Sequence, residues 1–293
     1  MAHSRLIADG HVHLYDCFSL DDFFAAAFRN LGFWAGRLYP GENLVKILML
    51  TEARGICFFD RLKNREIASA GRVYEIRETG DPAALAVMEK GKNVPLLYLL
   101  AGRQIVTAEN LEILALATDR QIEDGLPGRQ VLDRLKESQD IAVLAWGVGK
   151  WFFKRGQMVG EWLNDCVSPY LFLGDNSARP RFWPRPALFK RAEKGGIAII
   201  AGSDPLPFPA EATRVGSYGF ILEGEFDPAA PARSLRRMLT SNSRDIVLFG
   251  NRDSAPTFWQ RQSRILCRKY FTGKIDNNHT RSTTTINRLK GDK

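Results

Sequence analysis

The chain has 293 residues, of which 45% are hydrophobic and 25% charged, and its formal net charge is +8. A chain of this length and composition can bury a large core, as a soluble α/β barrel of about 250 residues does. No apolar run approaches the ~18–20 residues that cross a bilayer, and the first strand, expected by Leu6, leaves no room for a signal peptide. These features argue against a membrane protein and predict a cytoplasmic one.

Neither the positive charge nor the cysteines indicate a function for the part of the chain that precedes residue 268. Residues 268–293 hold seven basic and two acidic groups, a net +5, which leaves +3 for the remainder. The charge is therefore largely a property of the tail, and we expect no nucleic-acid partner for the body. The four cysteines form no Cys-x-x-Cys pair, which predicts reduced thiols in place of a zinc ribbon or a redox motif. They are Cys17, Cys57, Cys166 and Cys267.

In the first half of the chain, predicted strands and helices alternate and then give way to a strand-rich region. Residues 20–31 place apolar side chains at helical spacing after two acidic residues, whereas the continuous apolar run at 44–50 is typical of a buried strand. The predicted strands are Arg5–Ala8, Leu44–Leu50, Val73–Arg77 and Val94–Leu100, followed by a hairpin of Arg103–Thr107 with Leu111–Ala117. The predicted helices are Leu20–Leu31, Ala53–Lys63 and Asp81–Lys90.

The second half alternates more regularly between the two kinds of element. Glycine pairs and Gly-Pro turns separate the segments, as at Gly195-Gly196 after a predicted helix. The predicted strands are Ile141–Ala145, Pro169–Leu173, Ile197–Ala201, Gly219–Leu222 and Ile246–Phe249. The predicted helices are Arg129–Ser138, Met158–Leu163, Pro186–Lys194, Ala230–Ser241 and Pro256–Phe271.

This alternation of strands and helices predicts a parallel sheet. We therefore expect an α/β fold of the (β/α)8 type, a TIM-like barrel, regular or distorted, formed by residues 1–271 with a short β-rich insertion around residues 72–118. Residues 272–293 are polar and basic, which predicts a disordered C-terminal tail.

A pair of histidines follows the first predicted strand. His11 and His13 are two of only four histidines in the chain, and side chains at positions i and i+2 of a strand point to the same side. Two imidazoles placed in this way can hold one divalent cation if neighbouring groups fix their second nitrogens. The alternative is a surface or packed pair that binds nothing.

Two further predicted strands end in acidic groups. Asp175 with Asn176 follows one of them, and Asp204 follows another. In a barrel of parallel strands the chemistry gathers at the carboxyl ends of the strands, so these groups are expected to meet the histidines. Glu52, after residues 44–50, is an additional candidate ligand. Each acid alone has an alternative interpretation as turn or helix-cap chemistry.

Basic side chains near the same strand ends are candidates for binding substrate. Lys150 lies in a Gly-x-Gly-Lys loop after residues 141–145, which lacks the spacing of a nucleotide triphosphate loop. Arg179 follows Asn176 by three residues. Lys150, Asn176 and Arg179 are therefore predicted to bind substrate or to stabilise an oxyanion, the alternative for each charge being an ordinary solvated side chain.

Two short motifs resemble the first and last metal motifs of the amidohydrolase superfamily. They are Ala8-Asp9-Gly10-His11-Val12-His13 near the start and Gly202-Ser203-Asp204-Pro205 after a late strand. The resemblance implies a (β/α)8 barrel in which His11 and His13 bind a metal, often zinc, and Asp204 binds the metal or acts as the general base. Polymerase and histidinol phosphatase (PHP) domains also begin with His-x-His but usually have Asp-x-His later, where this chain has Leu206. The amidohydrolase resemblance is therefore favoured.

The chain departs from that family because it has no histidine between His13 and His279. We therefore expect a single metal ion, zinc or else manganese or iron, held by His11, His13, Asp204 and Asp175. The predicted function is a metal-dependent hydrolase that acts on a C–N, ester or related bond of a small molecule. The alternative is a degenerate barrel that binds a ligand or a protein partner without turnover.

Overall fold

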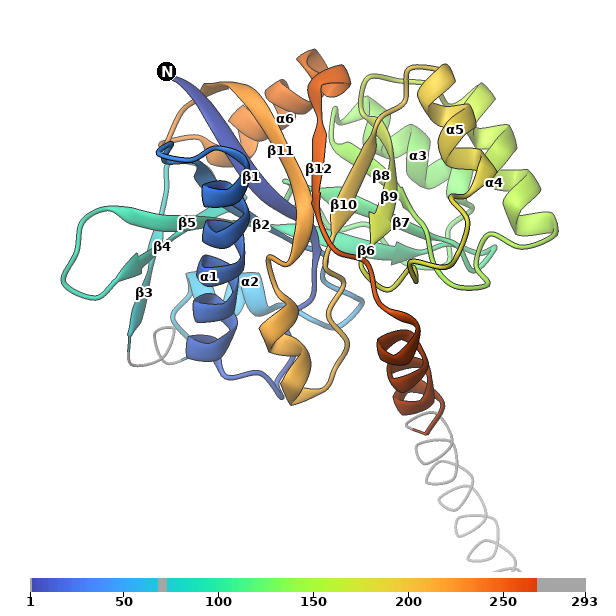
Figure 1. The fold of residues 1–293 in the computed structure, drawn as a ribbon. Helices are drawn as coiled ribbons and strands as arrows, with labels where there is room; N and C mark the ends of the chain where they lie inside the picture. Colours follow the sequence, from blue (N-terminus) through green and yellow to red (C-terminus); the bar gives the residue numbers. More distant parts are fainter. Residues whose placement is uncertain (1, 68–72, 268–293) are drawn as a thin grey trace, which may run out of the picture. The chain divides into compact units, whose positions relative to one another are not determined.

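The computed structural model describes residues 2–67 and 73–267 and divides the chain into two compact units (Figure 1). The first unit runs to Arg179 and resumes from Pro184 to Arg252, and the second comprises Pro180–Trp183 and the chain from Asp253. Every named strand belongs to the first unit, and the described part of the second contains a helix at 255–267. Within the described residues no helix has the length and apolar character needed to cross a membrane.

The larger sheet of the first unit has seven strands. Its central strands β1, β2 and β5 are parallel, while β11 and β4 flank them in the antiparallel sense. The order across the sheet is β12 (Val247–Gly250), β11 (Tyr218–Phe226), β1 (Ala2–Val12), β2 (Val45–Leu50), β5 (Pro95–Leu100), β4 (Ala84–Glu89) and β3 (Tyr74–Glu78).

The smaller sheet has five strands and a similar mixture of directions. Strands β8, β9 and β10 are parallel, and the hairpin of β6 and β7 adds to β8 in the antiparallel sense. The order is β10 (Ile199–Gly202), β9 (Leu171–Asn176), β8 (Ile141–Ala145), β7 (Glu112–Leu116) and β6 (Gly102–Val106).

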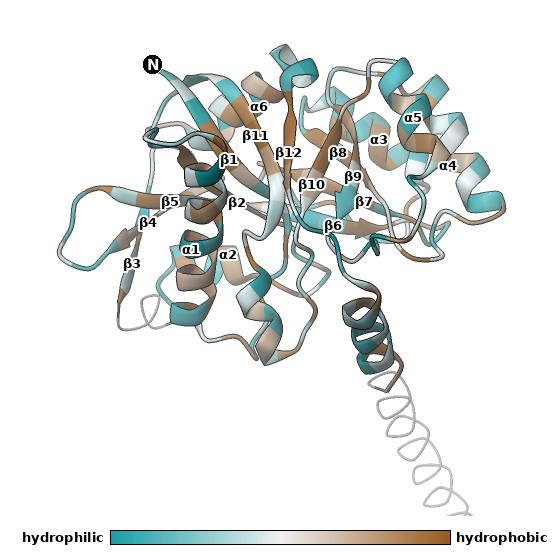
Figure 2. Cartoon of the chain, in the orientation of Figure 1, coloured by the Kyte–Doolittle hydropathy of each residue, from teal (hydrophilic) through white to brown (hydrophobic). Residues whose placement is uncertain are grey.

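Helices cover these sheets with their apolar faces. Figure 2 shows α1 and α5 with both polar and apolar colour, whereas strand β8 is apolar throughout. Helix α1 begins after Ser19, whose Oγ accepts a hydrogen bond from the Asp22 amide at 3.4 Å, as an N-cap does. The helices are α1 (Leu20–Leu38), α2 (Phe58–Lys63), α3 (Gly128–Glu137), α4 (Lys154–Asp165), α5 (Ala187–Lys194) and α6 (Pro231–Ser241), with 3₁₀ turns at Pro209–Arg214 and Ser243–Asp245.

The two faces of the smaller sheet belong to different hydrophobic clusters. Leu114 and Val143 point into the cluster shared with the larger sheet, while Ile113 and Leu144 point into a second cluster under α3, α4 and α5. This alternation follows from the two-residue period of a strand. A sheet buried on both faces requires nearly continuous apolar strands, which explains the sequence of β8.

The larger and smaller sheets meet where β1 and β10 pass each other, and glycine makes this approach possible. A Cβ atom at Gly202 would lie 2.2 Å from the His11 nitrogen, and one at Gly10 would lie 2.9 Å from the Ala201 oxygen. Side chains larger than hydrogen would force these backbones apart. The close approach brings the end of β1, with its histidines, beside the residues that follow β10.

The expected (β/α)8 barrel is wrong, because the strands form two separate mixed sheets and several of them are antiparallel. The region 72–118 is not an insertion, since β3 to β7 supply strands to both sheets. The helix predicted at Asp81–Lys90 is strand β4, where a short run of buried apolar residues fits either structure and pairing with β3 and β5 decides the outcome. The tail at 272–293 lies outside the described residues.

Candidate metal centre

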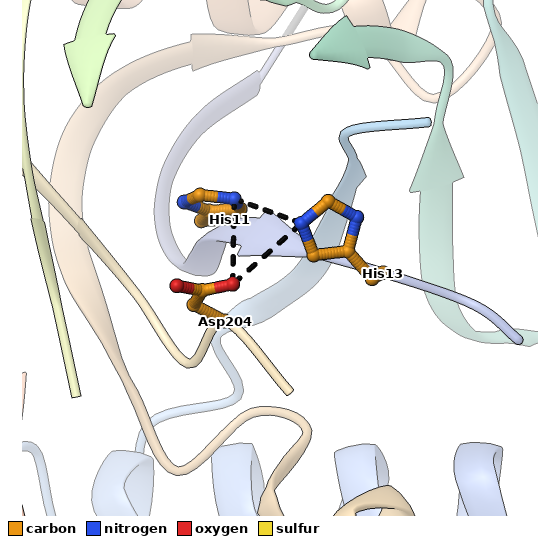
Figure 3. A group of neighbouring side chains, drawn as sticks. All are labelled: His11, His13 and Asp204. Carbon is orange, nitrogen blue, oxygen red and sulfur yellow. Dashed lines mark hydrogen bonds and ion pairs between the residues drawn. The ribbon is translucent and has the colours of Figure 1, made fainter. Parts of the chain in front are cut away.

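His11, His13 and Asp204 converge at the junction of the two sheets (Figure 3). The two histidine Nε2 atoms are 3.1 Å apart, and each lies 3.6 Å from Asp204 Oδ1. Both histidines are buried, whereas the Asp204 side chain is 24% exposed. The structure brings these three predicted residues together, although Asp204 lies about 190 positions from the histidines in the chain.

The separations between these three atoms suit a metal ion. A point about 2 Å from all three atoms lies close to the plane that they define, and Zn–N bonds are about 2.0–2.1 Å long. Two imidazoles and one carboxylate are also the ligand set of several catalytic zinc sites, which keep a further position for water or substrate. The residues present therefore fit one divalent cation.

Asp9 fixes the backbone around the centre. Its Oδ1 accepts hydrogen bonds from the amides of His11 at 3.2 Å and Ser203 at 2.8 Å, and its Oδ2 accepts one from Gly216 at 2.8 Å. Burial raises the pKa of this carboxyl to about 6, although the same hydrogen bonds oppose the change. Asp9 thus ties β1 to the segments before and after Asp204. Sequence reasoning missed this role, and the only available signal was an acidic residue within an apolar strand.

The surroundings of His13 keep its ring neutral. Burial lowers the pKa of His13 to about 4, with a further lowering from the charges of His11 and Lys150. The charge of Asp204 and a hydrogen bond with the Gln104 side chain act in the opposite direction. A neutral imidazole has the lone pair that a metal ligand needs, so His13 is ready to bind a cation at neutral pH.

Lys150 and Asn176, both predicted to bind substrate, lie near the centre. The Lys150 ammonium pairs with Glu112, and its charge also reaches the His13 ring. The Asn176 side-chain nitrogen donates to Asp204 Oδ2 at 3.0 Å. Lys150 therefore places a positive charge near the histidines, while Asn176 contacts Asp204 directly.

Asp175 and Arg179 are engaged with each other rather than with the three converging residues. Arg179 donates to both carboxylate oxygens of Asp175, from Nε at 2.7 Å and from Nη2 at 2.5 Å. The Tyr218 hydroxyl donates to the same carboxylate at 2.9 Å, and the backbone amide of Asn176 donates to it at 3.0 Å. All of these side chains are buried. The structure thus gives the Asp175 carboxylate an Arg–Tyr environment, which anchors the end of β9.

Glu52 lies at a separate position at the end of β2. Its Oε1 accepts a hydrogen bond from the Phe59 amide at 2.8 Å, and it lines a small pocket with Asp60, Arg103 and residues of 118–121. It does not belong to the cluster of potential metal ligands found among the described residues. Burial raises the pKa of Glu52 from 4.5 to about 7.

Replacing Glu52 with glutamine is expected to stabilise the protein at pH 8 and to leave its stability unchanged at pH 4. The raised pKa means that the stability contributed by Glu52 is complete below 4.5 and is lost as the pH rises through about 7. The difference corresponds to roughly 3 kcal/mol at most. Chemical unfolding at both pH values measures it, with the exposed Glu161→Gln as control. Loss of metal affinity in Glu52→Gln would instead make Glu52 a ligand.

Comparison with known proteins gives no family for this chain. No family model and no curated protein matches it. Among solved structures, PsfC from Pseudomonas syringae matches with a TM-score of 0.47 and 14% identity over 92% of this chain and 99% of PsfC. The lesion-specific endonuclease PfuEndoQ from Pyrococcus furiosus matches with a TM-score of 0.47 and 10% identity over 83% of this chain and 57% of that one.

A third solved structure is a complex of endonuclease Q with a 27-mer duplex substrate that has an abasic lesion at the active site. It matches with a TM-score of 0.45 and 11% identity over 81% of this chain and 57% of the endonuclease. This chain therefore spans little more than half of either endonuclease chain. With TM-scores below 0.5, these likenesses leave the function to be argued from the site itself.

Two sequence expectations are corrected at this point. The amidohydrolase resemblance is wrong, because the strands form two mixed sheets and not the barrel that it implies, and no family model matches the chain. The expectation of a small-molecule substrate with no nucleic-acid partner is also withdrawn; two endonuclease structures, one with a duplex substrate, are among the solved structures that the chain resembles. The placement of charge in the tail was not sufficient ground for excluding nucleic acid.

Proposed function

We propose that this protein is a metal-dependent hydrolase that holds one divalent cation on His11, His13 and Asp204 and cleaves phosphodiester bonds of a nucleic acid. The observation that carries the proposal is the convergence of two histidine nitrogens and one carboxylate oxygen on a common point. The two histidines are buried, while the Asp204 carboxylate that completes the group is partly exposed to solvent. That combination is what hydrolytic metal sites require.

The residues of the centre divide the chemical tasks among them. A divalent cation held there would supply Lewis-acid chemistry, namely a water nucleophile near neutral pH and polarisation of a phosphoryl oxygen. His11 and His13 would provide nitrogen ligands, and Asp204 Oδ1 would provide a carboxylate oxygen, which favours a cation. These three side chains would hold the cation, and a catalytic zinc site with three protein ligands keeps a further position for water or substrate.

Positive charge near the centre supports an anionic phosphodiester as the substrate. The ammonium of Lys150 acts on His13 and, together with a bound cation, would attract a phosphate group. The formal net charge of +8, of which residues 268–293 carry +5, also favours association of the whole chain with a polyanion. A nucleic acid is the abundant substrate class that combines a phosphodiester linkage with dense negative charge.

The expected result is cleavage of bis(p-nitrophenyl) phosphate and of labelled single-stranded or duplex oligonucleotides by protein loaded with zinc or manganese. Asp204→Ala should lower the rate by at least about 100-fold, because loss of a ligand exceeds the 10–100-fold effect of residues behind the ligands. Glu161→Gln, purified in parallel, controls for contaminating nucleases. Tight oligonucleotide binding without cleavage by metal-loaded protein would favour a binding protein over an enzyme. Equal cleavage rates for wild type and Asp204→Ala would show that the metal centre does not take part in the reaction.

A further inference from the structure

The side-chain amide of Asn176 connects three strand ends around the centre. Asn176 ends β9, and its Nδ2 donates one hydrogen bond to the Trp146 carbonyl after β8 and one to Asp204 Oδ2 after β10, each at 3.0 Å. Both acceptors lack a hydrogen to give in return, because one is a carbonyl and the other a carboxylate. The nitrogen of the amide must therefore face them, and this fixes the orientation of the side chain.

Asp204 depends on such support because its backbone is in an uncommon conformation. Its φ of 47° lies in the left-handed region, which residues other than glycine seldom adopt. Its backbone amide donates to the His11 carbonyl at 2.8 Å, and this bond places the backbone of the residue, not its carboxylate, beside β1. With Oδ2 taken by Asn176, Oδ1 is the oxygen that faces both histidines.

We infer that Asn176 is the positioning residue of the metal centre, holding Asp204 so that the aspartate binds the cation through Oδ1 alone. This inference rests on the proposed metal centre and adds a residue that directs the aspartate without touching the metal. Side chains behind metal ligands commonly fix ligand orientation and tune affinity in this way.

The other end of the same amide argues against a merely structural role. Asn176 is 4% exposed, and its Oδ1 has no hydrogen-bond partner. A buried acceptor without a donor is unfavourable, and a leucine of nearly the same shape would avoid it. The amide at this position therefore matters for what its nitrogen does, namely to hold Asp204 and the Trp146 carbonyl.

The test is titration of metal-free wild type and Asn176→Leu with zinc and with cobalt(II). We expect the leucine variant to bind both metals 10–100-fold more weakly, since this is the usual effect of removing a group that orients a ligand. We also expect its cobalt absorption spectrum to differ, because Asp204 can then bind through either or both oxygens. Asn242→Ala is the matched control, since Asn242 lies at the C-terminal end of α6 and its side-chain amide donates to the Glu223 carbonyl of β11, not to a residue of the centre.

Each outcome of this titration separates the positioning role from the proposed function. Unchanged metal affinity and an unchanged cobalt spectrum in a folded Asn176→Leu protein would overturn the positioning role while leaving the centre intact. Wild-type protein that binds no metal would overturn the centre itself and with it the role of Asn176. Metal binding that is weakened by Asn176→Leu, with no phosphodiester cleavage by wild type, would support the positioning role and reject only the proposed substrate. If Asn176→Leu fails to fold, Asn176→Ser, which has no amide, takes its place in the same comparison.

Discussion

Replacing His11 and His13 together with alanine will remove the metal from the protein and the stability that the metal confers. Wild-type protein should carry about one zinc, manganese or iron ion per chain, and the double variant should carry none, because a single carboxylate cannot hold the ion. Metal at 100 times its dissociation constant should stabilise wild type by about 2.7 kcal/mol and should not stabilise the variant. Elemental analysis and thermal unfolding with and without added zinc measure the two effects.

His3→Ala is the matched control for this experiment. His3 also lies on β1, but its side chain is 69% exposed and contacts Glu223 rather than the centre. The His3→Ala variant should therefore retain the full metal content. Wild-type protein that contains no metal after incubation with metal salts would contradict the proposed centre. Metal retained at full stoichiometry by the double variant would place the ion elsewhere.

Replacing Asp175 with alanine will destabilise the protein by about 3–5 kcal/mol, because it leaves the buried Arg179 guanidinium without a counter-charge. The variant also leaves the Tyr218 hydroxyl without the carboxylate to which it donates a hydrogen bond. Burial of both partners makes this loss far larger than that of a surface pair. The free energy of unfolding, from urea titration, measures the effect.

The surface pair Arg129–Asp165 provides the comparison for Asp175→Ala. Its side chains are 59% and 49% exposed, so Asp165→Ala should cost less than about 1 kcal/mol. If Asp175→Ala does not fold, Tyr218→Phe removes one hydrogen bond from the same cluster and should cost about 1–1.5 kcal/mol. Equal stability of wild type and Asp175→Ala would refute the anchoring role. If Asp175→Ala lost its metal but kept its stability, Asp175 would be a metal ligand, as predicted from the sequence.

The sequence was most informative where local chemistry is sufficient. Continuous apolar runs identified strands such as β2 and β8, and helical spacing with acidic first-turn residues identified α1. The two-residue period of a strand put His11 and His13 on one side. A polar group directly after an apolar run marked Asp204 as a strand-end residue. Each of these inferences uses only neighbours in the chain.

Sequence reasoning failed where partners are distant. Residues 84–89 became a strand because β3 and β5 offered backbone hydrogen bonds on both sides. Asp175 joined Arg179 and Tyr218 because the fold buried all three together, and burial makes an ion pair more favourable than a separate charge. The hydrogen bonds of Asp9 and Asn176 reach across strands and follow no sequence pattern.

By itself, the sequence placed His11, His13 and Asp204 among five candidate ligands, with Asp175 and Glu52, and at the ends of predicted strands, because residue type and local period are properties of the chain. Only the tertiary structure decided that the strands form two mixed sheets, that Gly10 and Gly202 let β1 and β10 touch, and that Asn176 rather than Asp175 contacts Asp204. The physical reason is that strand pairing and the partners of buried charges are chosen by packing between distant segments. Those choices depend on the whole core and cannot be made by any one segment alone.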